Sequence, residues 1–103
     1  MSKDLGKLFE NLVFSELLKR GFEIYFYNKD FECDIICKKD EKYFAFQVCY
    51  ELNSLNLQRE LNELKKLPLK DIEKKIITYN QNELIDDIEV VSFWEWFSGF
   101  GDR

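Results

Sequence analysis

The spacing of apolar residues predicts a helix at the start of the chain. Leucine, valine and phenylalanine recur every three or four residues between Asp4, a suitable N-cap, and Arg20, and Gly21 follows as a stop. This apolar face is broad, so it needs a large surface to pack against, and a β-sheet is the expected partner. Glu10 lies at the margin of the face, one turn before Phe14, where its carboxylate can turn inward or stay in solvent.

A second helix is expected between Ser54 and Pro68. Ser54 supplies an N-cap, Pro68 ends the helix, and leucines recur along one face between them. The remaining side of this helix is mostly charged or polar, Glu60 included, and we expect it to face outward.

Five strands are expected from runs of apolar and β-branched residues, at 22–27, 33–37, 43–50, 75–79 and 88–93. The first is apolar on both parities, which indicates a strand covered on both faces. The fourth follows a helix, so we expect it to run parallel to the third. The last leads into a short helical turn at Trp94–Phe97, with Trp94 in the core, while Trp96, Phe97 and Phe100 suit either the core or a docking surface.

The second and third strands form the centre of this prediction, as a hairpin around a charged turn. If Lys39 pairs with Lys42 across a two-residue loop, Asp34 stands directly opposite Gln47 on the same face. Their Cβ atoms then lie about 5 Å apart. The predicted fold is therefore α/β, a small mixed sheet in the order α-β-β-β-α-β-β flanked by helices.

Length and composition narrow the class of protein. With 103 residues, 46% of them hydrophobic and 34% charged, residues 1–103 form one globular domain. With a net charge of −5, the chain lacks the positive surface potential of a non-specific nucleic-acid binder, so we expect any contact with nucleic acid to be local and weak. The chain has no histidine, which excludes histidine-based acid–base catalysis and histidine-bearing metal sites. No apolar run approaches the ~20 residues of a membrane span, so we expect no membrane contact.

Three cysteines, Cys33, Cys37 and Cys49, fall in the expected strands. An odd number without a visible targeting segment predicts a reducing, cytoplasmic location. Cys33 and Cys37 would lie about 13 Å apart along one strand, too far to share a zinc ion or a disulfide. We expect all three to pack as small hydrophobic residues.

The order of elements, with Glu10 in the first helix, Asp34 in the second strand and the triplet Gln47-Val48-Cys49 in the third, resembles the PD-(D/E)xK nuclease superfamily. The segments Gly6–Val13, Ser15–Gly21 and Trp94–Trp96 are similar to the nuclease-like C-terminal domain of a group of prokaryotic AAA-type ATPases. The resemblance implies a restriction-endonuclease-like fold and an AAA-type ATPase as partner.

In an active member of that superfamily, acids hold Mg²⁺ or Mn²⁺ and a lysine assists the attacking water. Here Gln47 stands at an acid position and Cys49 at the lysine position, so the resemblance implies a degenerate catalytic motif. Glu10 and Asp34, with the Gln47 carbonyl, could still hold Mg²⁺ or Mn²⁺ weakly. Asp34 is equally well explained as an acid held by the Gln47 amide, and no other cofactor is expected.

Three functions follow as hypotheses. The favoured one is a catalytically degenerate recognition or docking domain associated with an AAA-type ATPase. The others are an active Mg²⁺- or Mn²⁺-dependent nuclease and a module that forms homo-oligomers through the terminal aromatic residues or an uncovered strand edge. The ATPase itself is not in this chain, because there is no Gly-x4-Gly-Lys-Ser/Thr loop.

A lysine-rich run is expected to be a solvated face rather than a phosphate-binding patch, and consists of Lys65, Lys66, Lys70, Lys74 and Lys75.

Overall fold

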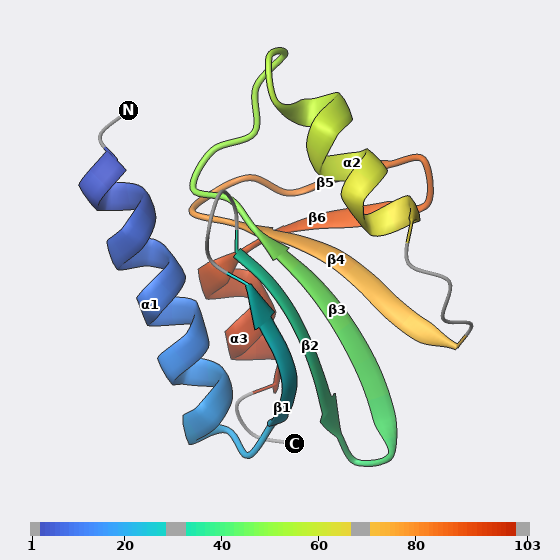
Figure 1. Ribbon diagram of the computed structural model, residues 1–103. Coiled ribbons are helices and arrows are strands. Elements are labelled where there is room, and N and C mark those ends of the chain that lie inside the picture. The colour runs from blue at the N-terminus through green and yellow to red at the C-terminus, as the bar shows by residue number, and fades with distance from the viewer. Residues whose placement is uncertain (1–2, 29–32, 67–70, 101–103) are drawn as a thin grey trace.

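The computed structural model describes residues 3–28, 33–66 and 71–100, and the structural statements below concern these ranges. The elements follow in the order α1 (Lys3–Lys19), β1 (Glu23–Asn28), β2 (Cys33–Lys39), β3 (Lys42–Val48), α2 (Leu57–Lys65), β4 (Ile72–Thr78), β5 (Glu83–Ile85), β6 (Ile88–Ser92) and α3 (Phe93–Phe100). Six strands form one mixed sheet with helices packed against it (Figure 1). This confirms the predicted α/β class and the mixed sheet.

The strands lie in the order β1-β2-β3-β4-β6-β5. The first three form an antiparallel meander, β4 runs parallel to β3 as predicted, and β6 runs parallel to β4. Strand β5 was not predicted, because three residues are too few to show an alternating pattern. It pairs antiparallel with β6 across a turn at Asp86 and Asp87, which both have positive φ angles, of 49° and 68°. Aspartate tolerates this left-handed backbone better than most residues.

Two hydrophobic clusters cover the two faces of the sheet. On one face α1 and α3 contribute Phe9, Val13, Leu17, Trp96 and Phe97, which pack with Ile35, Cys37, Phe44, Phe46, Val48, Ile77 and Val91 of the strands. On the other face the α2 residues Leu61 and Leu64 pack with Ala45, Ile76 and Val90. Because side chains alternate along a strand, neighbouring residues of β3 belong to different clusters.

Helix α2 differs from its prediction at the start and in one buried residue. The N-cap is Asn56 rather than Ser54, and the Asn53 side chain accepts hydrogen bonds from the backbone N–H groups of Leu55 and Asn56, at 2.8 and 3.1 Å. Glu60, expected to face outward, is buried. It lies one turn before Leu64 and therefore on the inward side of the helix. The predicted end at Pro68 lies outside the described residues.

Strand β1 lies at an edge of the sheet. The prediction that it is covered on both faces is wrong. Tyr25 and Phe26 are about half exposed. The β1–β2 register shifts between Ile24 and Phe26, so the strand carries a bulge at Tyr25. Apolar residues on both parities therefore mark an exposed edge here, rather than a buried central strand.

The terminal segment is a full helix, α3, and not the single turn that we predicted. Trp94 was expected in the core but is exposed, whereas Trp96 and Phe97 are buried. Phe93, Trp96 and Phe97 have the i, i+3, i+4 spacing of one helix face, which leaves Trp94 on the outer side. The Phe100 side chain lies outside the description. None of the described helices is long and apolar enough to cross a membrane.

Candidate functional site

Strands β2 and β3 place Asp34 directly opposite Gln47, in the register in which Lys39 pairs with Lys42. The turn between them consists of Asp40 and Glu41, whose φ angles are 53° and 67°. Two positive φ angles in a two-residue loop are typical of a type I′ turn, which matches the twist of a hairpin. The predicted register is confirmed, and the turn explains why it is fixed.

Asp34 and Gln47 line a cavity of about 80 Å³ between the sheet and α2. Phe26 of the edge strand and Leu64 of α2 line the same cavity. Gln47 is only 1% exposed, and the Oδ1 atom of the half-buried Asp34 is buried as well. Ligand pockets usually measure about 300–1,000 Å³, so this cavity takes a few water molecules and not a nucleotide.

Cys49 follows the end of β3 and lies on the same side of the sheet as Gln47. Its backbone N–H donates to the Ile77 carbonyl at 2.9 Å, and its thiol donates to the Glu51 carbonyl at 3.1 Å. The side-chain amide of Asn56 donates to the same Glu51 carbonyl at 3.0 Å and contacts the Cys49 sulfur at 3.7 Å. Cys49 thus joins β3 to the start of α2, and a thiol held in this way supplies no positive charge.

Glu10 comes from a different layer of the molecule. Helix α1 packs on the face of the sheet that bears Ile35 and Phe46, whereas Asp34 and Gln47 point toward α2 on the opposite face. Glu10 is half-buried and does not line the cavity of Asp34 and Gln47. The structure therefore brings two of the predicted site residues together, with Cys49 nearby on the same side, and places Glu10 on the helix that covers the other face.

The donor set of this cavity fits a divalent ion poorly. Mg²⁺ and Mn²⁺ prefer about six oxygen ligands, and the cavity offers one carboxylate and one amide in a space for few waters. Within residues 3–28, 33–66 and 71–100, no group of three or more Asp, Glu, Cys or His side chains is placed to hold a metal. A site of Glu10, Asp34 and the Gln47 carbonyl has only two such side chains, so it stays a prediction.

Cys37 packs as the small hydrophobic residue that we predicted. It is fully buried in the cluster under α1, and burial raises the pKa of its thiol to about 12. The thiolate that would attack a substrate or bind a metal is therefore absent at neutral pH. The side chain of Cys33 lies outside the description.

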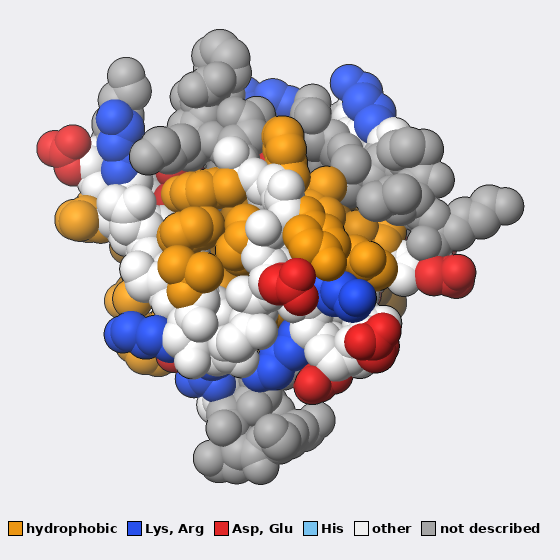
Figure 2. All heavy atoms as spheres, turned by 60° about the horizontal axis from the view of Figure 1, so that its bottom comes forward, with side chains coloured by type: hydrophobic (Ala, Val, Ile, Leu, Met, Phe, Trp, Pro, Cys, Tyr) orange, Lys and Arg blue, Asp and Glu red, His pale blue; other side chains and the backbone are white. Residues whose placement is uncertain are grey.

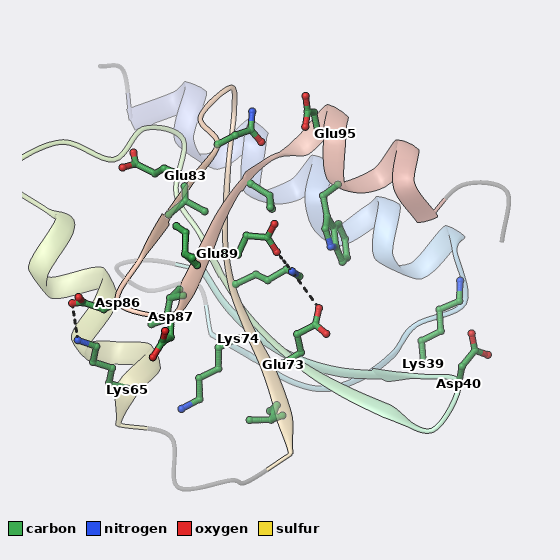
Figure 3. A pocket seen from close by; sticks show the side chains of 18 residues that line it. Lys39, Asp40, Lys65, Glu73, Lys74, Glu83, Asp86, Asp87, Glu89 and Glu95 are labelled. Atoms are coloured by element: carbon green, nitrogen blue, oxygen red, sulfur yellow. Dashed lines mark hydrogen bonds and ion pairs between the residues drawn. The ribbon is translucent and has the colours of Figure 1, made fainter.

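A second, much larger hollow of about 1290 Å³ lies beside β4, β5 and β6, with α3 at one side (Figure 3). All of its labelled residues are charged, and they come from these strands and the β5–β6 turn, from α2 and α3, and from the β2–β3 hairpin. Lys75 lines the hollow, and its ammonium pairs with the carboxylates of Glu73, at 3.3 Å, and Glu89. The Lys75 side chain is only 12% exposed, so its charge is largely used by these two partners.

Glu73 is also held by a third strand, because the Lys42 ammonium of β3 lies 2.5 Å from its carboxylate. Burial acts to raise the pKa of Glu73, but the hydrogen bonds and charges of Lys42 and Lys75 outweigh it and hold the pKa below its usual value. This network was not predicted from the sequence. The expected strand began at Lys75, so Glu73 lay outside it, and the position of Glu89 beside them depends on the β4–β6 register.

The predicted lysine run does not form one cationic patch. Lys74 and Lys75 are neighbours on β4 and therefore point to opposite faces of the sheet. Lys65 pairs with Asp86 at 3.1 Å and Lys75 with two glutamates. Lys70 lies outside the described residues. Nearby acids thus dilute the positive charge, as expected.

Comparison with known proteins places the chain among proteins of unassigned function. Residues 5–96 match the family described as "Domain of unknown function (DUF4143)". The chain is 42% identical to an uncharacterized protein of Methanocaldococcus jannaschii, over 92% of this chain and 25% of the relative. It is 37% identical to an uncharacterized protein of Haemophilus influenzae, over 84% of this chain and 22% of the relative. The chain thus spans about a quarter of the length of these relatives. No solved structure matches it significantly.

Proposed function

The chain belongs to the DUF4143 family, and from this premise we propose that it is a nuclease-like domain without hydrolytic activity, which serves as the recognition or docking domain of an AAA-type ATPase. The observation that carries the proposal is the small size of the cavity at Asp34 and Gln47. Gln47 is buried, and the cavity that it lines with Asp34, Leu64 and Phe26 measures only about 80 Å³.

Hydrolysis of a phosphodiester needs room for the scissile phosphate, the attacking water and a metal ion. The cavity has no such room, and Gln47 and Cys49 are neutral where the resembling nucleases carry an acid and a lysine. A hairpin register like that of a nuclease, beside a cavity this small, supports a structural role for Asp34 and Gln47. Under this proposal the restriction-endonuclease-like hairpin is retained as scaffold.

The proposed link to an ATPase rests on the family of this chain and on the length of its two relatives. Domains of this family are typically found with AAA-type ATPases. The two relatives are about four times as long as the region that this chain matches, which leaves ample length for an ATPase domain. This chain has no phosphate-binding loop of its own.

A cleavage assay tests the absence of hydrolysis. The purified chain is incubated with single- and double-stranded DNA and RNA, with Mg²⁺ and separately with Mn²⁺, beside Asp34→Ala. We expect no cleavage by either protein. Metal-dependent cleavage by the wild type that Asp34→Ala abolishes would overturn the proposal in favour of an active nuclease with a variant motif.

Chemical cross-linking of the full-length Methanocaldococcus relative tests the docking role. Cross-links are expected between lysines of the region that matches this chain and lysines of the remaining polypeptide. A full-length protein in which the matched region gives only internal cross-links would contradict docking, whatever the cleavage assay shows.

A further inference from the structure

Hydrophobic side chains gather on the face that carries the free edge of the sheet. Figure 2 looks at the molecule from the end that bears β1 and the β2–β3 turn, and shows these side chains in the middle of the face with charged groups along its lower border. The most exposed aromatic residues of β1 and β3 are Tyr25, Phe26 and Tyr43, at 51%, 50% and 38%. Together with the half-buried Ile36 of β2, we call them the β1 patch.

The bulge in β1 creates this patch. Ile24 is paired with Cys37 and Phe26 with Ile36, which leaves Tyr25 as the extra residue between them. The Tyr25 ring lies 5.7 Å from that of Tyr43, on the side of the sheet that α2 partly covers. Two successive aromatic residues therefore face the same way, which a regular strand would not allow.

Helix α2 does not extend over the patch. Its buried residues Leu61 and Leu64 contact Ala45, Ile76 and Val90 of β3, β4 and β6, and Leu64 reaches only as far as Phe26 at the rim of the small cavity. Tyr25, Phe26 and Tyr43 are consequently exposed to solvent beside an edge strand.

The two edges of the sheet differ. Strand β5 has three residues and is followed by the acidic turn of Asp86 and Asp87, features that discourage pairing with another chain. Strand β1 has six residues, Glu23-Ile24-Tyr25-Phe26-Tyr27-Asn28, and carries the aromatic side chains. Of the two edges, β1 is the one suited to contact.

The charges around the patch suit a second copy of the chain. The whole chain carries −5, which would oppose self-association through most of its surface. Next to the patch, Glu23 and Lys38 are cross-strand partners, and Lys38 lies 3.8 Å from Glu41 and 5.3 Å above the Tyr43 ring. Because acidic and basic side chains both lie next to the patch, those of one protomer can face opposite charges of a second copy across a two-fold axis.

We propose that the β1 patch is the contact surface of a homodimer, in which two copies pack their β1 patches against each other about a two-fold axis. At roughly 200 Å² for a whole aromatic side chain, the exposed parts of the three rings amount to roughly 300 Å² per protomer. This is less than half of the ~800 Å² per partner of a stable complex, so the dimer dissociates on dilution. The inference does not rest on the proposed ATPase association.

Sedimentation velocity of the 103-residue chain over a wide concentration range tests the dimer. The wild type is expected to shift from monomer to dimer as the concentration rises. Phe26→Glu is expected to weaken the dimer about tenfold or more, because it places a charge at the centre of the contact. The matched control is Leu84→Glu, an exposed leucine on the opposite edge strand β5, which is expected to leave dimerisation unchanged.

Circular dichroism and thermal unfolding of both variants show whether each one keeps the fold, and Tyr43→Lys provides a second variant of the patch if Phe26→Glu unfolds. A wild type that stays monomeric at every concentration would overturn the proposal. A dimer that Leu84→Glu disrupts and Phe26→Glu does not would also overturn it.

Discussion

Gln47 is the residue on which the chemistry of the candidate site depends. It lies opposite Asp34 across the hairpin, almost fully buried, at a position where the resembling nucleases carry a carboxylate. A neutral amide can both donate to a carboxylate and accept from another group, whereas a second carboxylate can only accept. The site therefore accommodates one negative charge and not two.

Gln47→Glu is accordingly expected to lower the free energy of unfolding at pH 7 by roughly 2–4 kcal/mol, through two carboxylates about 5 Å apart. Urea denaturation at pH 7 and at pH 4 measures the effect, which should shrink at pH 4 as the introduced acid takes up a proton. Gln47→Met, similar in size but uncharged, is the control for lost hydrogen bonding. An equal loss at both pH values in Gln47→Glu would contradict charge repulsion as the cause.

Several single residues were predictable from the sequence and others were not. The opposition of Asp34 and Gln47 followed from turn length alone, because a two-residue loop fixes the register of both strands. The burial of Glu60 and the exposure of Trp94 were not predicted, although Glu60 lies one turn before Leu64 and Trp94 lies next to Phe93 and two residues before Trp96, off the face that they form. Residue type was given more weight than helix geometry in those two cases.

Helix α2 determines whether the small cavity is closed. Leu64 lines the cavity with Asp34 and Gln47 and also belongs to the hydrophobic cluster on that face. Its position follows from a nine-residue helix that lies over β3 and β4.

Leu64→Ala is expected to lower the free energy of unfolding by about 2–5 kcal/mol, the usual cost of removing a buried leucine side chain. Chemical denaturation measures it, with Leu55→Ala, an exposed leucine before the same helix, as the control that should change little. A loss below ~1 kcal/mol would show that Leu64 is not packed as described. If the enlarged cavity of a folded Leu64→Ala chain supported nuclease activity, closure by α2 would be the only barrier to catalysis.

Three strands are joined by the charges around Glu73. Lys42 of β3 and Lys75 of β4 hold its carboxylate, and Lys75 also pairs with Glu89 of β6. The pKa of Glu73 lies below its ordinary value of 4.5, so the charged form is favoured in the folded chain. Stability from this group is therefore fully present above about pH 4.5 and is lost as the pH falls through the lower, folded pKa.

Glu73→Gln tests this linkage. The wild type should be more stable than the variant at pH 6, and the difference should shrink steadily below about pH 4.5, as measured by thermal unfolding at a series of pH values. Glu51→Gln, at an exposed position in the loop before α2, is the control for replacing a surface glutamate by glutamine. A difference between wild type and Glu73→Gln that stayed constant from pH 6 to pH 3 would rule out the proposed charge network.

At the scale of helices and strands, the sequence predicted the elements that are long enough to show a hydrophobic period. Helix α1 and strands β2, β3 and β6 lie close to their expected positions. Strand β4 begins at Ile72, three residues before the expected start, and the crossover through α2 made it parallel to β3. The edge position of β1 was not predicted, because an aromatic run looks the same in a covered strand and in an exposed edge strand. The hairpin partner of β6 was missed, because β5 is too short to have a period.

At the scale of the whole molecule, contacts between segments far apart in the chain could not be predicted from the sequence. The hollow beside β4, β5 and β6 depends on where α3 settles, and α3 packs through Trp96 on Phe22 and Phe46, far away in the chain. Such contacts are set by the summed packing of the core and not by any local pattern. The resemblance to a nuclease domain rested on a predicted order of elements that lacked β5, and it did not indicate which residues would line the site.

The strand order has a consequence for how the chain reaches its fold. Strands β1, β2 and β3 are neighbours both in the sheet and in sequence, whereas β4 joins β3 only after the loop and helix between them are ordered. Closing short loops costs less entropy, so the three-stranded meander is expected to form early and to serve as a template for β4 and β6.

Stopped-flow refolding in urea examines this order. Ile35→Val, in the meander, should slow folding, whereas Val90→Ala, in β6, should mainly speed unfolding. The reverse assignment would mean that the parallel half of the sheet organises first. If the meander does form early, the edge of β3 is exposed until β4 pairs with it, and the rate of this pairing sets how long partly folded chains can meet and aggregate.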